Sequence, residues 1–328
     1  MYKKIVEFRP SISSENMGDH IIQHYISKQM DGIFGDHLTV TMPTRSHLTA
    51  RNIKHIDTAD YSFVCGTNLL ASNMDKRRQW DLCKRDMFRV HDVVLLGVGW
   101  WQYQEEPNWY TKTLLKRILS TQVLHSVRDN YTEQMLKSAG IQNVLNTGCP
   151  TMWGLTQEKV DRIPSYKGRS VVTTLTNYMQ NDELDKYIID ILLSNYEVVY
   201  VWLQAIEVYN QLRRMGYEKK VQIVSPTLKA YNELLRKDSL DYIGTRLHGG
   251  IHALNNEKRS LIIAVDNRAR EISKDTKLPV IGREEVKEKL ESMINNNWKI
   301  EIELPIVNIR KWKAQFTSEF DGFNWGGV

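Results

Sequence analysis

Short apolar runs alternate with longer amphipathic stretches along the first half of the chain. The runs are four to six residues long, rich in β-branched side chains and bounded by polar residues or glycine, which is typical of strands. They predict strands at residues 4–8, 38–41, 61–65, 92–96 and 121–126. Apolar positions at helical spacing predict helices at residues 19–30, 110–119 and 132–139.

The same pattern restarts after residues 156–168, a polar stretch with Pro164 and Gly168 that is typical of a linker. Strands are predicted at residues 170–175, 197–203, 221–224, 241–244 and 260–265. Helices are predicted at residues 182–193, 227–236, 248–254, 283–294 and 307–320. Alternating strands and helices indicate an α/β protein whose two halves each contain a parallel sheet.

The pattern therefore predicts a Rossmann-like N-terminal domain at residues 1–160 and a second one at residues 161–305. Residues 306–328 are expected to form a helix that crosses back to the first domain, followed by a glycine-rich tail. Ligands of doubly wound domains bind where the carboxyl ends of the strands meet. We therefore expect the site in a cleft that the two domains face.

Composition narrows the class of protein. With 41% hydrophobic and 25% charged residues, the 328-residue chain is typical of globular proteins. No apolar run approaches the ~18–20 residues of a membrane span, and no signal peptide is recognisable. Three scattered cysteines match neither a disulfide framework nor a zinc site, so a cytoplasmic protein is expected. The net charge of +5 suits anionic substrates, whereas the absence of nucleic-acid motifs argues against DNA or RNA.

The most informative segment, at residues 241–254, reads DYIGTRLHGGIHAL. A predicted strand leads through Thr245 and Arg246 into a predicted helix, and free N–H groups at a helix start favour an anion. The Arg246 guanidinium suits phosphate or carboxylate, and His248 can exchange a proton near neutral pH. An ordinary strand–loop–helix junction is the alternative interpretation.

Two features of the same segment concern glycine and metal. Gly249 and Gly250 would let a ligand approach the backbone closely. His248 and His252 have the spacing of a helical zinc site, but the glutamate of a metalloprotease and a third ligand are missing. No metal site is therefore expected.

This segment resembles the signature of the polysaccharide pyruvyl transferases. Two further blocks agree with it: NMGDHII at residues 16–22 resembles the family's Asn-x-Gly-Asp loop, and SVRD at residues 126–129 resembles its Val-Arg-Asp block. The blocks stand in the family's order and cover the chain from about residue 16 to residue 275. One departure is GVGWW at residues 97–101, where the family often has a glycine triplet.

The resemblance implies a GT-B-like fold, in which two Rossmann-like domains face a cleft. It implies transfer of a pyruvyl group from phosphoenolpyruvate to two hydroxyls of a sugar, with a cyclic ketal formed and phosphate released. The acceptor would be a surface polysaccharide or its lipid-linked precursor. Phosphoenolpyruvate would be a co-substrate, no cofactor is implied, and the enzyme would work in the cytoplasm or at the inner face of the membrane.

The resemblance also implies roles for particular residues. The anionic donor would be bound by Arg128, Thr245, Arg246, His248, Gly249 and Gly250. Ketal formation needs an acid for the methylene carbon and a base for a hydroxyl. His248 fits the acid or a donor to the leaving phosphate, and Asp19 fits the base, although the two roles can be exchanged. Arg128 and Arg246 complete the catalytic set.

Simpler roles stay open for several of these residues. Asp19 is equally explained as a cap of the first helix, and Arg128 as the partner of Asp129. Candidate substrate contacts are Asn16, Gly18, Trp100, Trp101, Asn177 and Gln204. The two tryptophans are equally explained as packing residues.

Two other functions fit the same residues. A GT-B-type glycosyltransferase would bind the diphosphate of a nucleotide sugar, and a glycan-binding protein on this scaffold would need neither acid nor base. The segment at residues 309–316, apolar with basic flanks, either docks on the first domain or contacts an anionic membrane surface. The acceptor sugar and the oligomeric state are not indicated.

Overall fold

The computed structural model describes residues 2–317 and divides into two compact units. The first comprises Met1–Ser13, Ile22–Pro150 and Leu304–Val328, and the second comprises Ser14–Ile21 and Thr151–Glu303. The division thus falls ten residues earlier than the sequence predicts, and the segment around Asp19 belongs to the second unit. Hydrogen bonds explain both differences: Asn255 Nδ2 donates to the Thr151 carbonyl at 2.8 Å, and the Met17 N–H donates to the Gln204 carbonyl at 3.0 Å.

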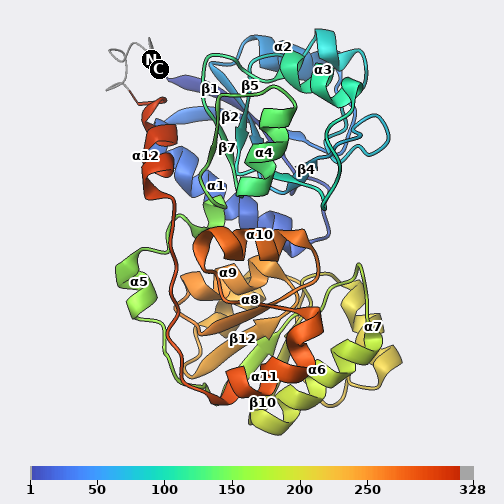
Figure 1. Ribbon diagram of the computed structural model, residues 1–328, viewed down its shortest axis with the longest axis vertical. Helices are drawn as coiled ribbons and strands as arrows, with labels where there is room; N and C mark the ends of the chain where they lie inside the picture. The colour runs from blue at the N-terminus through green and yellow to red at the C-terminus, as the bar shows by residue number, and fades with distance from the viewer. Residues whose placement is uncertain (1, 318–328) are drawn as a thin grey trace. The chain divides into compact units, whose positions relative to one another are not determined.

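The first unit is built on a parallel sheet with the strand order β2-β1-β3-β5 (Figure 1). Its strands are β1 (Lys3–Arg9), β2 (His37–Pro43), β3 (Tyr61–Cys65) and β5 (Val93–Leu96). Two short parallel pairs accompany it: β4 (Asn68–Leu70) with β6 (Gly99–Trp100), and β7 (His125–Val127) with β8 (Val144–Asn146). The helices are α1 (Met17–Phe34), α2 (Ala50–Asp57), α3 (Trp109–Ile118), α4 (Asn130–Ser138), α12 (Ile306–Ala314) and the 3-10 turns η1 (Asp86–Phe88) and η2 (Pro150–Met152).

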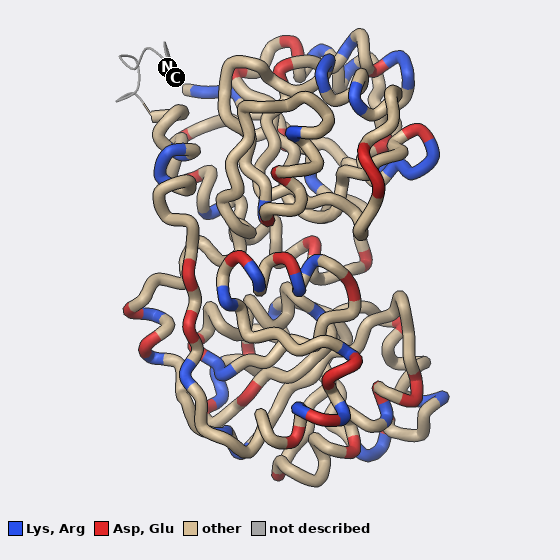
Figure 2. Tube along the Cα trace, viewed as in Figure 1, with Lys and Arg blue, Asp and Glu red and all other residues tan. Residues whose placement is uncertain are grey.

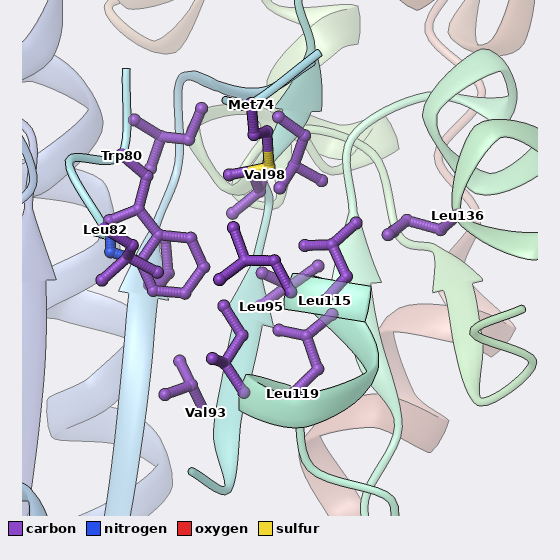
Figure 3. Packing of buried hydrophobic residues seen from close by; sticks show 14 of the residues in the cluster. Met74, Trp80, Leu82, Val93, Leu95, Val98, Leu115, Leu119 and Leu136 are labelled. Carbon is purple, nitrogen blue, oxygen red and sulfur yellow. The ribbon is translucent and has the colours of Figure 1, made fainter. Parts of the chain in front are cut away.

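Apolar side chains from the strands and from α3 form the core of the first unit. Figure 3 shows Val93 and Leu95 of β5 packed with Leu115 and Leu119, and Trp80 lies beside them. All five are less than 5% exposed. Because both faces of a parallel sheet are covered, its strands read as nearly continuous apolar runs, which is why the sequence predicts them well.

Helix α12 buries its apolar side in the first unit. Trp312 is 0% exposed, and its ring lies 6.1 Å from that of Phe63, while Phe316 lies 5.3 Å from the same ring. The apolar side of residues 309–316 is therefore not open to a membrane. The predicted tail and the end of the predicted helix at residues 307–320 lie outside the described residues.

The second unit holds a six-stranded parallel sheet with the order β11-β10-β9-β12-β13-β14. Its strands are β9 (Ser170–Thr173), β10 (Val198–Trp202), β11 (Gln222–Val224), β12 (Leu240–Gly244), β13 (Ser260–Ala264) and β14 (Val280–Gly282). Its helices are α5 (Gln157–Asp161), α6 (Asp182–Asn195), α7 (Glu207–Met215), α8 (Leu228–Leu235), α9 (Leu247–Asn255), α10 (Asn267–Thr276), α11 (Val286–Asn295) and the 3-10 turn η3 (Arg283–Glu285). In residues 2–317, no helix has the length and apolar character that a membrane crossing needs.

One buried carboxyl in α6 makes stability depend on pH. Asp185 is 0% exposed, and Gln211 Nε2 donates to its Oδ2 at 2.8 Å, whereas Asp185 Oδ1 and Gln211 Oε1 lack hydrogen-bond partners within residues 2–317. Burial raises the pKa of Asp185 from its ordinary 3.8 to about 6. The folded state therefore binds this proton more tightly, and the free energy of unfolding falls as the pH rises from about 4 to about 6.

Asp185→Asn is expected to raise the free energy of unfolding at neutral pH by about 1–2 kcal/mol, because an amide carries no charge to desolvate. It should also flatten the decline of stability between pH 4 and 6. Urea unfolding at several pH values measures both effects. Asp182→Asn, on the same helix, is the control: its partly exposed carboxylate pairs with Arg214, which lowers its pKa, so no gain is expected. If the free energy of unfolding of Asp185→Asn still declines between pH 4 and 6, another titrating group causes the decline.

Candidate functional site

The candidate site of the second unit lies where the strand order reverses. The chain passes from β9 to β10 on one side of the sheet and returns to β12 on the other, so the carboxyl ends of β9 and β12 are neighbours. Ligands of open α/β sheets bind at such a reversal. Thr245 joins the two strand ends, because its N–H and its Oγ1 both donate to the Thr174 carbonyl, at 2.8 and 3.1 Å. The Thr245 hydroxyl therefore holds the two loops together, which differs from the anion-binding role that we expected for it.

Arg246, directly after β12, is a buried cation held by neutral oxygens. It is 4% exposed; its Nε donates to the Leu175 carbonyl at 3.1 Å and its Nη2 to Asn177 Oδ1 at 2.6 Å. Within residues 2–317 no carboxylate forms an ion pair with it. Burial lowers the pKa of Arg246 to about 10, so it remains protonated at neutral pH. The carboxylates of Asp19, Glu207 and Asp266 act on this charge only from beyond ion-pair distance, so its burial is costly and an anionic ligand would offset the cost.

Helix α9 begins directly beside this guanidinium. Arg246 occupies the N-cap position, but its side chain makes no capping hydrogen bond, and His248 is the second residue of the helix, 5% exposed. Two buried tyrosines fix the first turn: Tyr242 Oη donates to the Arg246 carbonyl at 2.6 Å, and Tyr231 Oη donates to the Gly249 carbonyl at 2.9 Å. The positive end of the helix dipole is thus held rigidly next to a cation.

The two glycines of this turn serve packing rather than the close approach of a ligand that we expected. A Cβ on Gly250 would lie 2.5 Å from Ile262 Cγ1, and one on Gly249 would lie 3.1 Å from Tyr242 Oη. Only a residue without a side chain lets α9 approach β12 and β13 this closely. Their backbone N–H groups remain part of the helix start, which is the property an anion would use.

The loop before α1 is attached to the second unit. Asn16 Oδ1 accepts hydrogen bonds from the Gly18 N–H at 3.1 Å and from Gln204 Nε2 at 3.0 Å. Asn16, not Asp19, therefore caps α1. Asp19 is 2% exposed, and its Oδ2 accepts from Ser14 Oγ at 2.7 Å. The N-cap position that the sequence left open for Asp19 is thus taken by Asn16, and the predicted role of the Asp19 carboxylate stays a prediction.

Gln204 links this loop to the first turn of α9. A Cβ on Gly18 would lie 2.7 Å from Gln204 Nε2, and one on Gly249 would lie 3.0 Å from Gln204 Oε1. Because Asn16 Oδ1 already accepts from a backbone N–H, the group of Gln204 that faces it must be the donor amide. Gln204 Oε1 is then an acceptor, buried and without a hydrogen-bond partner in the described part of the chain. It suits a ligand hydroxyl.

Tyr178, Arg268 and Asp266 were not proposed as site residues from the sequence. The ring of Tyr178 lies between two guanidinium groups, 5.2 Å from that of Arg246 and 5.4 Å from that of Arg268. Arg268 in turn pairs with Asp266, the N-cap of α10, at 2.6 Å. The neighbouring Asn177, a candidate substrate contact, is exposed, and its Oδ1 accepts from Arg246. No periodic pattern marks such a loop.

In the first unit, Arg128 lies fully buried against a glycine. Its Nε donates to Asp129 Oδ2 at 3.1 Å and its Nη2 donates to Asn68 Oδ1, while its Nη1 has no partner in residues 2–317. A Cβ on Gly99 would lie 2.2 Å from Arg128 Cζ, so a side chain at this position would displace the guanidinium. Asp129 also caps α4, since its Oδ1 accepts from the Thr132 N–H at 2.7 Å. The unpartnered Nη1 is the group left for an anion.

The two tryptophans do not offer the sugar-stacking surface proposed for them. Trp100 is 0% exposed, and its Nε1 donates to Ser72 Oγ at 3.3 Å and to Gln104 Oε1 at 3.2 Å. Trp101 is partly buried, and the guanidinium of Arg77 lies over its ring at 3.2 Å. Trp100 is a core residue, because an apolar ring on a short buried strand is better packed than solvated.

No metal centre is built from the described residues. Within residues 2–317, no three His, Cys, Asp or Glu side chains are placed to hold a metal ion. His252 lies one turn after His248 on α9, and its Nε2 is 2.6 Å from Asn232 Oδ1. The helical spacing of the two histidines therefore has no third ligand in this part of the structure.

Comparison with known proteins was made by sequence and by structure. Residues 16–267 match the profile of the family described as polysaccharide pyruvyl transferase. Comparison with curated protein sequences gave no match. Among solved structures, UDP-GlcNAc 2-epimerase from Methanocaldococcus jannaschii, in complex with UDP-GlcNAc and UDP, is 14% identical with a TM-score of 0.52. The match covers 95% of this chain and 97% of that one.

A second UDP-GlcNAc 2-epimerase, from Neisseria meningitidis and bound to UDP-GlcNAc, is also 14% identical, with a TM-score of 0.46. That match covers 95% of this chain and 97% of the epimerase. At such low identity the likeness concerns the fold alone, which is α/β with parallel sheets and GT-B-like.

Proposed function

Because the chain belongs to the polysaccharide pyruvyl transferase family, we propose that it transfers a pyruvyl group from phosphoenolpyruvate to a sugar in a surface polysaccharide or its lipid-linked precursor. The observation that supports this donor is Arg246, a buried guanidinium with no carboxylate partner in residues 2–317, beside the start of α9. Phosphoenolpyruvate carries a phosphate and a carboxylate on three carbons, and it would bring the missing negative charge.

The reaction needs two hydroxyls and one proton transfer to carbon. A proton adds to the methylene carbon of phosphoenolpyruvate, and the first sugar oxygen bonds to the neighbouring carbon. The bond from that carbon to the phosphate oxygen then breaks, and phosphate leaves with the bonding electrons. The second hydroxyl adds to the oxocarbenium-like carbon and loses its proton, which gives the cyclic ketal. Of the two hydroxyl protons lost, one is balanced by the new methyl hydrogen and the other by the proton that the leaving phosphate takes up, so no net proton is released.

Residues of the second unit supply groups for these steps. Arg246 and the N–H groups at the start of α9 would hold the phosphate and stabilise the charge that develops as it leaves. His248, on the same turn, would donate the proton to carbon or to the leaving phosphate, and Asp19 would take a hydroxyl proton. Gln204 Oε1 would accept from a sugar hydroxyl and so orient it. Arg128 of the first unit stays a predicted second cation for the donor.

The test of the donor is isothermal calorimetry of the full chain with phosphoenolpyruvate, UDP and UDP-sugars. Binding of phosphoenolpyruvate alone supports the proposal, and the product is then sought by mass spectrometry as a pyruvate ketal on a panel of sugar and lipid-linked acceptors. Binding of UDP compounds without phosphoenolpyruvate would instead establish the glycosyltransferase alternative. Binding without turnover on any acceptor would favour a glycan-binding protein.

His248→Ala is expected to lower the rate of phosphate release at least about 100-fold, because general acid–base catalysis typically contributes that much. Its affinity for phosphoenolpyruvate should change much less, since Arg246 and the backbone remain. His252→Gln, one turn further along α9, is the matched control and should keep the rate. Equal rates in His248→Ala and the unchanged chain would remove His248 from the mechanism.

A further inference from the structure

Two neighbouring segments of the first unit expose only positively charged side chains, although the exposed Glu106 just before α3 pairs with Lys112. We define this basic face as α3 together with residues 84–89, which include η1. Its exposed cations are Lys84, Arg85, Lys116 and Arg117, while Arg89 and Lys112 are partly exposed. Asp86, the acidic residue of these two segments, is 2% exposed and so contributes little surface. Figure 2 shows Lys and Arg gathered at the end of the unit where Figure 1 labels α3.

Two large aromatic rings stand on the basic face. Phe88 is 75% exposed and Trp109 is 78% exposed, which is unusual for such apolar side chains. The Arg117 guanidinium lies 5.0 Å from the centre of the Phe88 ring, so the two segments are adjacent. Trp109, Lys112 and Lys116 are three and four residues apart on α3 and therefore share one side of the helix.

The folded unit does not need these side chains. The opposite side of α3 holds the helix in place through Leu114, Leu115 and Ile118, which are at most 1% exposed. Within residues 2–317, none of the four exposed cations forms an ion pair; the cations of this face that do are Lys112, with Glu106 at 3.2 Å, and Arg89, with Asp86 at 4.0 Å. The charges are thus available to an external anion.

We propose that the basic face binds the anionic phospholipid surface of a membrane. Lysine and arginine near such a surface are attracted to its lipid headgroups, and tryptophan and phenylalanine partition into the boundary between headgroups and acyl chains. A soluble polyanion would use the cations but would leave Phe88 and Trp109 in water. A membrane accommodates both kinds of side chain, so the combination favours it.

This inference does not rest on pyruvyl transfer, because it follows from the surface alone. If the proposed function is also correct, binding would bring the enzyme to the surface that holds a lipid-linked acceptor. The proposed membrane binding and the proposed pyruvyl transfer can fail separately, because vesicle binding is measured without donor or acceptor. The aromatic side chains of residues 309–316 do not supply this contact, because Trp312 and Phe316 are buried in the first unit.

The test is flotation of the full chain with vesicles of phosphatidylcholine and with vesicles that also contain phosphatidylglycerol. At low salt, binding is expected only to the anionic vesicles. The variant Lys84→Gln/Arg85→Gln/Lys116→Gln should lower the partition coefficient roughly 100-fold, at about fivefold for each charge. Trp109→Ser should lower it roughly tenfold, because the ring leaves water only partly.

A matched control has the same loss of charge on the second unit: Lys219→Gln/Lys229→Gln/Arg236→Gln, all exposed positions. It should bind anionic vesicles nearly as well as the unchanged chain. Equal losses in both triple variants would overturn the proposal, because net charge alone would then explain the binding. Absence of binding to anionic vesicles at low salt would also overturn the proposal. A third contrary result is vesicle binding that Trp109→Ser leaves unchanged and that soluble polyphosphate abolishes. That result would indicate a site for a soluble polyanion.

Discussion

Arg246→Met is expected to lower the affinity for phosphoenolpyruvate about 30-fold to several thousand-fold and, at the same time, to stabilise the protein. The loss of affinity follows because charge-assisted contacts to a buried anion are each worth about 2–5 kcal/mol. The gain in stability follows because a guanidinium that is 4% exposed and has no carboxylate partner is replaced by an apolar side chain of similar length. Similar replacements of buried charges gain about 1–4 kcal/mol.

Calorimetry with phosphoenolpyruvate and urea unfolding of the full chain measure the two effects of Arg246→Met. Arg246→Lys keeps the charge but not the planar fork, so we expect intermediate affinity. Arg236→Met, an exposed arginine of the same unit, is the control for general effects and should change neither quantity. Normal affinity in Arg246→Met would show that the donor binds elsewhere. Reduced stability would show that Leu175 and Asn177 already offset the buried charge.

Arg259→Met is expected to lower the free energy of unfolding by about 3–5 kcal/mol, the largest stability effect that we predict. Arg259 is 3% exposed, and its Nη1 lies 3.1 Å from Asp241 Oδ2. Its Nη2 donates to the carbonyls of Met293 and Asn296, at 2.7 and 2.8 Å, next to the end of α11. Without the guanidinium, the buried carboxylate of Asp241 on β12 loses its counter-charge and keeps only the Tyr196 hydroxyl and the Gly168 N–H as donors, and the two carbonyls lose the Arg259 donor.

The pH dependence of unfolding gives a second readout for Arg259→Met. Burial already raises the pKa of Asp241, although Tyr196 and Arg259 oppose the rise. Removing Arg259 raises this pKa further, so the variant should lose more stability as the pH rises past the ordinary carboxyl range. Adding Asp241→Asn should restore part of the loss. Arg162→Met, which breaks the exposed pair with Glu257, should have little effect. Equal effects of the two arginine replacements would contradict this account.

Local patterns in the sequence were enough to predict most of the fold. The buried strands β1, β9 and β13 read as apolar runs, and their predicted positions agree with the structure to within two residues. Helices α2, α5, α7 and α10 were not predicted, and α5 lies within the stretch that the sequence predicts as a linker. Helix α10 places only Ala269 and Ile272 as apolar residues in the core, and the Asp266 cap supports its start, so its periodic signal is weak.

Part of the candidate site could also be predicted from local patterns in the sequence. The segment from β12 to α9 is continuous in the chain, so its strand, its arginine and its helix start were all visible in order. The roles of single residues were less predictable. Asn16 caps α1 in place of Asp19, Thr245 ties two strand ends together, and Trp100 is a core residue. The roles of Thr245 and Trp100 depend on partners far away in the sequence, whereas the Asn16 cap is a local contact with the Gly18 N–H.

The sequence by itself determined the α/β class and the family, and it predicted an anion site at residues 244–250, because these follow from local periodicity and contiguous motifs. Only the tertiary structure decided that the Asp19 segment belongs with Arg246, that Tyr178 lies between two guanidinium groups, and that Arg246 lacks a carboxylate partner in the described residues. The physical reason is that burial and charge pairing are properties of contacts between distant segments. A local pattern indicates which side of an element is buried, but not what covers it.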